Sequence, residues 1–148
     1  MKKILTIIVI LILNINTANS IEPDIFVQST VNRASEILSK NISKEEKIEN
    51  LKLIAEETVD IKGIGFYTLG SYRKTLNEEQ KKEYTKLFKS YFLKSFSSRL
   101  VDYSDPKINV ISEKKINDKY TIVGTVLEET SKNHEIKIDW RIYTKNPD

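Results

Sequence analysis

The fold is decided mainly by residues 59–100, which read VDIKGIGFYTLGSYRKTLNEEQKKEYTKLFKSYFLKSFSSRL. It holds a short apolar segment, a break at Leu69-Gly70 and a long segment rich in aromatic side chains. The large rings recur at helical spacing at Tyr84, Phe88, Tyr91, Phe92 and Phe96. Residues three and four apart share a helix face, so the pattern predicts a long helix with one wide aromatic face.

Local signals place the ends of two helices in this stretch. Asp60 is suited to cap a short helix that contains Ile61, Ile64, Phe66 and Tyr67 and stops at Leu69-Gly70. Asn77 with Gln80 forms a second capping pair, which predicts a helix from there to about residue 100.

Two amphipathic helices are expected before this stretch. The first begins at Glu22-Pro23, runs to Asn41 and carries one apolar face, made by Val27, Val31, Ala34 and Leu38. Ser43 and Glu46 then have the spacing of a capping box. They predict a second helix, whose apolar positions are Ile48, Leu51, Ile54 and Ala55.

After Pro106 the apolar period changes from helical to two, which predicts strands. A first strand holds Ile108 and Val110 and ends at a turn predicted at Asn117-Asp118. A second covers residues 120–127 and is apolar on both sides, and a third covers residues 135–143. Helices followed by an antiparallel meander indicate an α+β fold, with amino-terminal helices packed on one face of the sheet.

The amino terminus has the layout of a secretory signal peptide. Lys2 and Lys3 precede an apolar run at residues 4–13, and Ala18-Asn19-Ser20 ends the polar segment that follows. The run is shorter than the roughly 20 apolar residues of a spanning helix. We expect residues 1–20 to be a cleaved signal peptide and residues 21–148 to form one domain; the alternative is an uncleaved membrane anchor.

Composition narrows the classes of function. Residues 21–148 carry 22 basic and 21 acidic side chains, so the charge balance gives no support for nucleic-acid binding. The chain has no cysteine and a single histidine, His134, which is expected on the surface. No metal site, catalytic triad or glycine-rich phosphate loop can be assembled, so the sequence predicts a protein that is not an enzyme and has no cofactor.

Several motifs together resemble one protein family. They are Phe26-Val27, Val59-Asp60, the run LGSYRKTL at residues 69–76, Gln80, Phe88, Ser98-Arg99-Leu100, Tyr103 and the strand IDWRI at residues 138–142. This pattern is similar to the MlaC family, also called toluene-tolerance auxiliary proteins. The resemblance implies a periplasmic phospholipid carrier, with two partners: an outer-membrane lipoprotein complex, and an inner-membrane ABC transporter that has a substrate-binding ring protein.

Members of that family continue with a further strand and a final helix. This chain ends at Thr144-Lys145-Asn146-Pro147-Asp148, where the turn before that strand is expected. The resemblance therefore implies an MlaC-like lipid-binding domain at residues 21–148 that lacks these two elements.

A lipid carrier needs a dry apolar cavity, since each exposed methylene costs about 0.8 kcal/mol in water. We expect the helices and a curved sheet to enclose one. The predicted lining is Ile64, Tyr67, Leu69, Phe88, Tyr91, Phe92, Tyr120, Ile122, Val126, Ile138 and Trp140. Arg73, Lys74 or Arg99 could meet a headgroup phosphate or an acidic partner. Two alternatives stay open: a non-catalytic adaptor or degenerate fragment of a carrier, and a small-molecule enzyme on a cone-shaped α+β fold.

Overall fold

The computed structural model describes residues 21–129 and 134–145. Its elements, in chain order, are α2 (Pro23–Ser39), α3 (Lys44–Thr58), α4 (Ile61–Thr68), the 3-10 helix η1 (Gly70–Lys74), α5 (Glu78–Leu100), β1 (Ile108–Asn117), β2 (Tyr120–Leu127) and β3 (Ile136–Tyr143). The helices come before the strands, which confirms the predicted α+β class. None of the helices in the described part is long and apolar enough to cross a bilayer.

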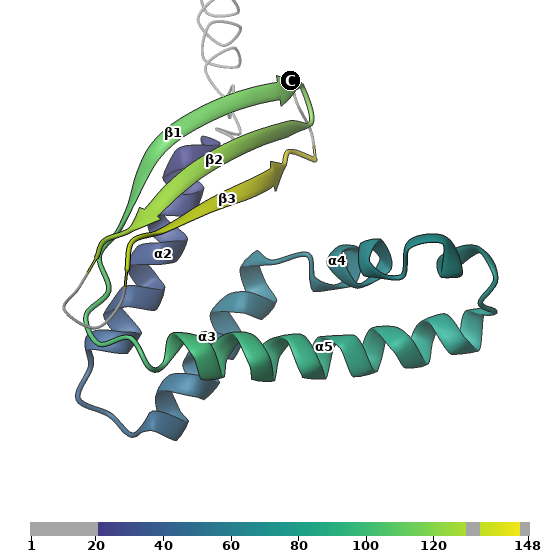
Figure 1. Ribbon diagram of the computed structural model, residues 1–148, viewed down its shortest axis with the longest axis horizontal. Coiled ribbons are helices and arrows are strands. Elements are labelled where there is room, and N and C mark those ends of the chain that lie inside the picture. Colours follow the sequence, from purple (N-terminus) through teal and green to yellow (C-terminus); the bar gives the residue numbers. More distant parts are fainter. Residues whose placement is uncertain (1–20, 130–133, 146–148) are drawn as a thin grey trace, which may run out of the picture.

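The three strands form a curved antiparallel sheet in the order β1-β2-β3. The register between β2 and β3 runs without interruption from Tyr120 opposite Tyr143 to Leu127 opposite Ile136. β1 is less regular, with register shifts at Val110/Ser112 and Lys115/Asn117. α2 lies across one face of the sheet, and α3 connects it to the remaining helices (Figure 1).

The first core lies between α2 and the sheet. Val123 of β2 is fully buried and packs with Val27 and Val31 of α2. Side chains that are directly opposite in an antiparallel pair share a face, so Trp140, opposite Val123, joins this core. The indole Nε1 of Trp140 donates a hydrogen bond of 2.8 Å to the Oγ1 of Thr125, which is also fully buried.

A second core joins α3, α4 and α5. Its buried members are Ala55, Ile61 and Leu93, and half-buried Phe88, Phe92 and Phe96 pack around them. The rings of Tyr84, Phe88, Phe92 and Phe96 stack in series, with successive centroids 5.9, 6.1 and 5.6 Å apart. Tyr91 does not belong to this series and is 70% exposed, so its predicted place in the aromatic stripe is wrong. The rings that stack are those four residues apart, while Tyr91 lies on the exposed side of α5.

The capping signals read from the sequence are confirmed. Ser43 with Glu46, and Asn77 with Gln80, form complete capping boxes at the starts of α3 and α5. Asp60 Oδ1 accepts a hydrogen bond of 2.9 Å from the N–H of Gly63. Gly70 adopts a φ of 55°, a conformation that side chains with a Cβ rarely adopt, and so ends α4 at the predicted break.

Two predicted boundaries differ from the structure. α2 ends at Ser39, two residues before Asn41. The β1–β2 turn consists of Asp118 and Lys119, because Asn117 still pairs with Tyr120. The Asn117 side chain accepts hydrogen bonds from the N–H groups of Lys119 and Tyr120 and so closes the turn.

α4, η1 and α5 form an arm that extends away from the sheet (Figure 1). The arm depends on a close approach at Gly65, where an added Cβ would lie 2.9 Å from Cδ1 of Phe88. We expect Gly65→Val to lower the free energy of unfolding by about 2 kcal/mol, since overpacking would displace a ring held in the stack.

Urea denaturation followed by circular dichroism measures this loss. Lys62→Val is the matched control, because it introduces the same β-branched residue at an exposed position of α4. Equal losses in the two variants would contradict the close packing at Gly65.

Candidate functional site

The interior of this protein is divided into two cores, and large apolar side chains that belong to neither core are exposed on the arm and on the sheet. On the arm, Ile64, Tyr67 and Tyr72 are 39%, 80% and 72% exposed. On the sheet, Ile136 is 40% exposed and Ile138 is half-buried. Exposed apolar groups in such numbers are typical of a surface that binds something.

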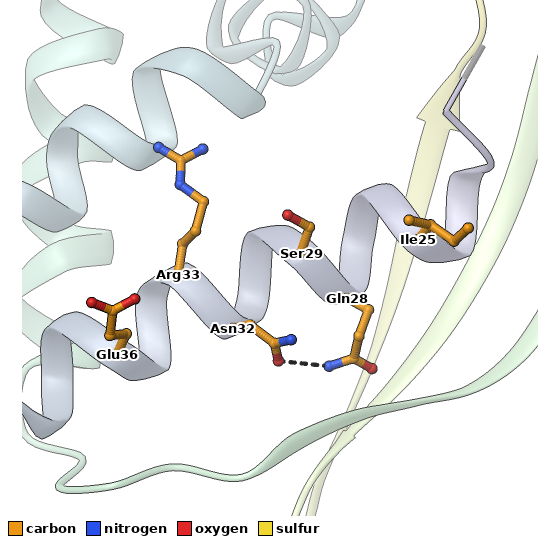
Figure 2. Close-up of a pocket in the computed structure, with 6 residues that line it drawn as sticks. All are labelled: Ile25, Gln28, Ser29, Asn32, Arg33 and Glu36. Atoms are coloured by element: carbon orange, nitrogen blue, oxygen red, sulfur yellow. Dashed lines mark hydrogen bonds between the residues drawn. The ribbon is translucent and has the colours of Figure 1, made fainter. Parts of the chain in front are cut away.

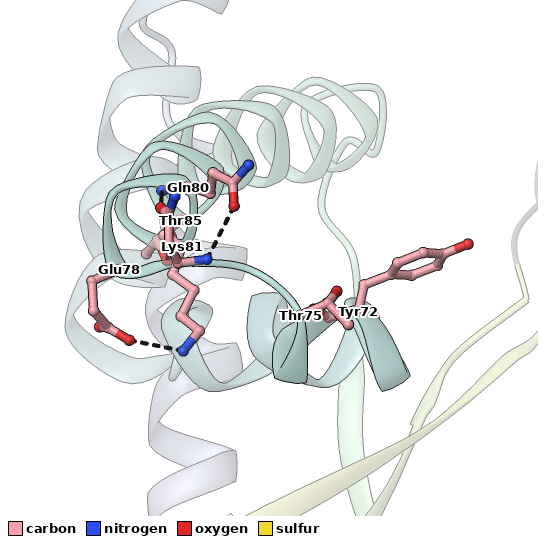
Figure 3. Close-up of polar contacts among 7 residues, drawn as sticks. Tyr72, Thr75, Glu78, Gln80, Lys81 and Thr85 are labelled. Carbon is pink, nitrogen blue, oxygen red and sulfur yellow. Dashed lines mark hydrogen bonds and ion pairs between the residues drawn. The ribbon is translucent and has the colours of Figure 1, made fainter.

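On the arm, these side chains lie on the part of α4 and η1 that does not contact α5. Gly65 approaches Phe88, and the hydroxyls of Thr68 and Tyr84 are 2.8 Å apart, so these contacts define the face of α4 against α5. At about 100° per residue, Tyr67 lies roughly 160° around the helix axis from Gly65 and about 100° from Thr68, and so points away from that face. The ring of Tyr72 also points away from α5 (Figure 3). α4 itself lies between α5 and the sheet (Figure 1).

On the sheet, the corresponding surface is the α2-facing side of β3. Ile136, Ile138, Trp140 and Ile142 are opposite Leu127, Thr125, Val123 and Thr121, the four buried β2 residues that carry side chains. α2 packs mainly against β1 and β2, so the apolar side of β3 is only partly covered. The uncovered part therefore lies on the same face of the sheet as α2.

The structure does not bring the predicted lining of the strands together. Ile138 and Trp140 lie on the α2-facing side, as described above. Tyr120, Ile122 and Val126 are opposite Tyr143, Arg141 and Lys137, and therefore lie on the other side of the sheet. Instead, the ring of Tyr120 lies 4.2 Å from the guanidinium carbon of Arg141. A single cavity lined by all five strand residues is thus not the arrangement observed.

The predicted residues of the helices fall into two groups. Phe88 and Phe92 belong to the second core, between α3, α4 and α5, and half-buried Leu69 is the carboxyl-terminal cap of α4. Ile64 and Tyr67 are exposed on α4, and Tyr91 is exposed on α5. The predicted lining omitted Tyr72 and Ile136, although Ile136 shares the apolar face of its strand with Ile138 and Trp140, and Tyr72 lies in the motif LGSYRKTL.

Two hollows in the surface lie elsewhere. One, of about 450 Å³, runs along α2 beside Ile25, Gln28, Ser29, Asn32, Arg33 and Glu36, where the amide of Gln28 donates to Asn32 (Figure 2). The other, of about 390 Å³, lies between α3 and α5 beside Ile48, Lys52, Ser90, Leu93, Lys94 and Ser98. Neither contains a residue of the predicted lining, so the enclosed apolar cavity stays a prediction.

The cations suggested for a headgroup lie on helix ends. Arg73 and Lys74 form the last turn of η1, and Arg99 lies in the last turn of α5; all three are exposed. Arg73 and Lys74 directly follow Tyr72, so they border the uncovered apolar surface of the arm. Their contact with a phosphate stays a prediction.

Two carboxyl groups with lowered pKa values, those of Glu46 and Glu78, lie in the first turns of helices. A hydrogen bond from the Ser43 hydroxyl lowers the pKa of Glu46, and a hydrogen bond from Lys81, 2.8 Å away, lowers the pKa of Glu78 (Figure 3). Both groups are exposed and stabilise first turns. The side chain of His134 is fully exposed, as predicted. No cluster of potential metal ligands occurs among residues 21–129 and 134–145.

Comparison with known proteins assigns this chain to a family. Residues 28–148 match the sequence profile of the MlaC protein family. The chain belongs to the MlaC family. No curated protein sequence matches it.

A solved structure shares the fold of this MlaC protein. It is a phospholipid-binding protein from Ralstonia solanacearum, determined in complex with a phospholipid. The two chains are 13% identical and superpose with a TM-score of 0.67, over 84% of this chain and 71% of the other.

Proposed function

We propose that this MlaC protein is a phospholipid carrier. In this proposal the acyl chains lie between the apolar side of β3 and the uncovered side of α4 and η1. One observation carries it: the two cores are separate, and Ile64, Tyr67, Tyr72, Ile136 and Ile138, which belong to neither core, are exposed or half-buried on α4, η1 and β3. A bound lipid would cover these groups and remove their unfavourable contact with water.

A surface of this kind lowers the cost of moving acyl chains through water. Transfer of one sixteen-carbon chain through water exposes apolar area that costs on the order of 12 kcal/mol, from about 0.8 kcal/mol per methylene. A carrier lowers this barrier by replacing water with apolar side chains, and it needs no titratable group to do so. Family membership and the phospholipid complex of the Ralstonia protein support this assignment.

The route of transport is the more specific part of the proposal. The signal-like segment at residues 1–20 supports export to the periplasm, where the protein would shuttle phospholipid between an outer-membrane lipoprotein complex and an inner-membrane ABC transporter with its ring protein. Arg73 and Lys74 would meet the headgroup phosphate at the border of the apolar surface. The protein would act as a binder and not as an enzyme.

A vesicle assay tests the carrier function. Donor vesicles hold a self-quenched fluorescent phospholipid, and acceptor vesicles of the same lipid hold none. The protein should increase the rate of fluorescence recovery in proportion to its concentration. Binding of the fluorescent lipid without faster transfer would favour an adaptor, and neither binding nor transfer would contradict the proposal.

A further inference from the structure

The single tryptophan, Trp140, lies where the covered part of β3 meets the uncovered part. On the α2-facing side of this strand, Ile136 is 40% exposed and Ile138 is half-buried, and neither is part of the first core. Trp140 and Ile142, further along the strand, pack against that core. Trp140 is itself half-buried, so one part of the indole contacts the core and another part stays accessible next to the row of Ile138.

A hydrogen bond holds the indole across the sheet. Its Nε1 donates to the Oγ1 of Thr125 on β2 at a distance of 2.8 Å. Thr125 is opposite Ile138, and it is therefore the diagonal neighbour of Trp140, within reach of a large ring. The ring thus leans over β2 and toward the row of Ile138, where the uncovered part of this face begins. The contact is internal to the β2–β3 pair.

Thr125 is an unusual residue for its place in the protein. It has no exposed surface and lies between the buried Val123 and Leu127 on the same face of β2. Valine has nearly the same shape and no polar atom to bury, so packing alone would favour valine at this position. The Thr125 hydroxyl accepts from the indole and donates to the carbonyl oxygen of Ile138 at 3.4 Å. The buried hydroxyl and the N–H of Trp140 therefore satisfy each other.

The orientation of the indole matters to an acyl chain beside it. The N–H is the one polar group of the ring, and it only donates. An N–H turned toward acyl chains would lose its hydrogen bond to water and gain no other, which is unfavourable. Thr125 binds this N–H on the side of β2 and leaves the carbon atoms of the indole to border the uncovered apolar surface.

We propose that Trp140 contacts the acyl chains of the bound lipid, and that Thr125 is a positioning residue that keeps the indole N–H turned away from them. The inference rests on the proposed function and adds to it a residue that touches no lipid. Because Thr125 is fully buried, its hydroxyl affects the ligand only through the ring of Trp140.

Quenching of tryptophan fluorescence tests the contact, since Trp140 is the only emitter of its kind. Protein expressed from the full 148-residue chain is loaded from vesicles of phosphatidylethanolamine and phosphatidylglycerol, and the vesicles are removed by gel filtration. Lipids brominated in the middle of the acyl chains should lower the emission relative to the same lipids without bromine. Bound lipid without quenching would overturn this proposal and leave the carrier function standing. A protein that takes up no lipid would contradict both.

Two substitutions of Thr125 separate positioning from packing. Thr125→Val keeps the shape and removes the acceptor, whereas Thr125→Ser keeps the acceptor and removes a methyl group. At equal amounts of folded protein, the partition of lipid from vesicles to protein should fall at least about threefold in Thr125→Val and stay close to the unaltered value in Thr125→Ser. A larger loss in Thr125→Ser than in Thr125→Val would show that Thr125 only fills the core, and would overturn the proposal.

Trp140→Phe completes a double-mutant cycle with Thr125→Val. Phenylalanine has no N–H, so the hydroxyl of Thr125 has nothing to position in that background. Thr125→Val should therefore lower lipid partition in the presence of Trp140 and cause no further loss in Trp140→Phe. An equal loss in both backgrounds would show that Thr125 acts independently of the indole, and would overturn its positioning role.

Discussion

Replacing Val123 with Glu will abolish most of the stability of this protein. Val123 has no exposed surface and packs between Val27 and Val31 of α2. A carboxylate at this position would be buried without a partner, which costs at least about 3 kcal/mol. Urea unfolding followed by circular dichroism and by the fluorescence of Trp140, the single tryptophan, measures the loss.

Ile122→Glu is the matched control for this prediction. Ile122 is the neighbouring residue of β2 but lies on the other side of the sheet, opposite Lys114 of β1 and Arg141 of β3. A glutamate there would lie between two cations, and the change in stability should stay within about 1 kcal/mol. If both variants unfold equally, α2 does not cover the face of the sheet that the structure assigns to it.

Replacing Tyr67 with Glu will remove bound phospholipid without unfolding the protein. The side chain is 80% exposed and turned away from α5, so its loss should cost little stability. In the carrier it would contact acyl chains, where a carboxylate must be desolvated. We expect lipid affinity to fall at least about tenfold, which corresponds to about 1.4 kcal/mol. Quantitative lipid extraction from purified protein, with thin-layer chromatography, checks this.

Leu53→Glu provides the comparison. Leu53 is 58% exposed on α3, on the side opposite the buried Leu51, Ile54 and Ala55. The substitution introduces the same charge as Tyr67→Glu, at an exposed apolar residue outside the proposed binding surface. Lipid content should equal that of the unaltered protein. Loss of lipid from both variants, or from neither, would show that the surface around Tyr67 is not the site.

Local chemistry made much of this fold predictable from the sequence. Ser43 with Glu46, and Asn77 with Gln80, fix two helix starts through contacts within four residues. The alternation of Ile136, Ile138, Trp140 and Ile142 likewise fixes the faces of β3. Such signals depend on neighbours in sequence, so no tertiary information is required to read them.

The face of β2 could not be predicted in the same way. Both sides of the strand carry apolar residues, and the larger ones, Tyr120 and Ile122, lie outside the α2 core. The buried side is chosen by α2 and includes Thr121 and Thr125, whose polar oxygens make them poor core candidates by type. The Thr125 hydroxyl is buried because it accepts from Trp140, a contact between strands that no local pattern shows.

The place of the candidate site also depended on tertiary structure. The sequence predicted that aromatic residues of α5 would line a cavity, yet Phe88 and Phe92 pack into the second core with α3 and α4. α4 and η1 therefore present the uncovered surface, through Ile64, Tyr67 and Tyr72. A stripe of rings indicates a buried helix face, but not which neighbour covers it.

Native mass spectrometry of the protein, purified from a bacterial periplasm without detergent, tests the central claim most directly. One spectrum reports both the compactness of the chain, through its charge states, and the mass of anything bound. The carrier assignment predicts a compact chain with an adduct of phospholipid mass, lost in Tyr67→Glu and kept in Leu53→Glu. A compact chain that never carries such an adduct, even after incubation with phospholipid vesicles, would contradict it.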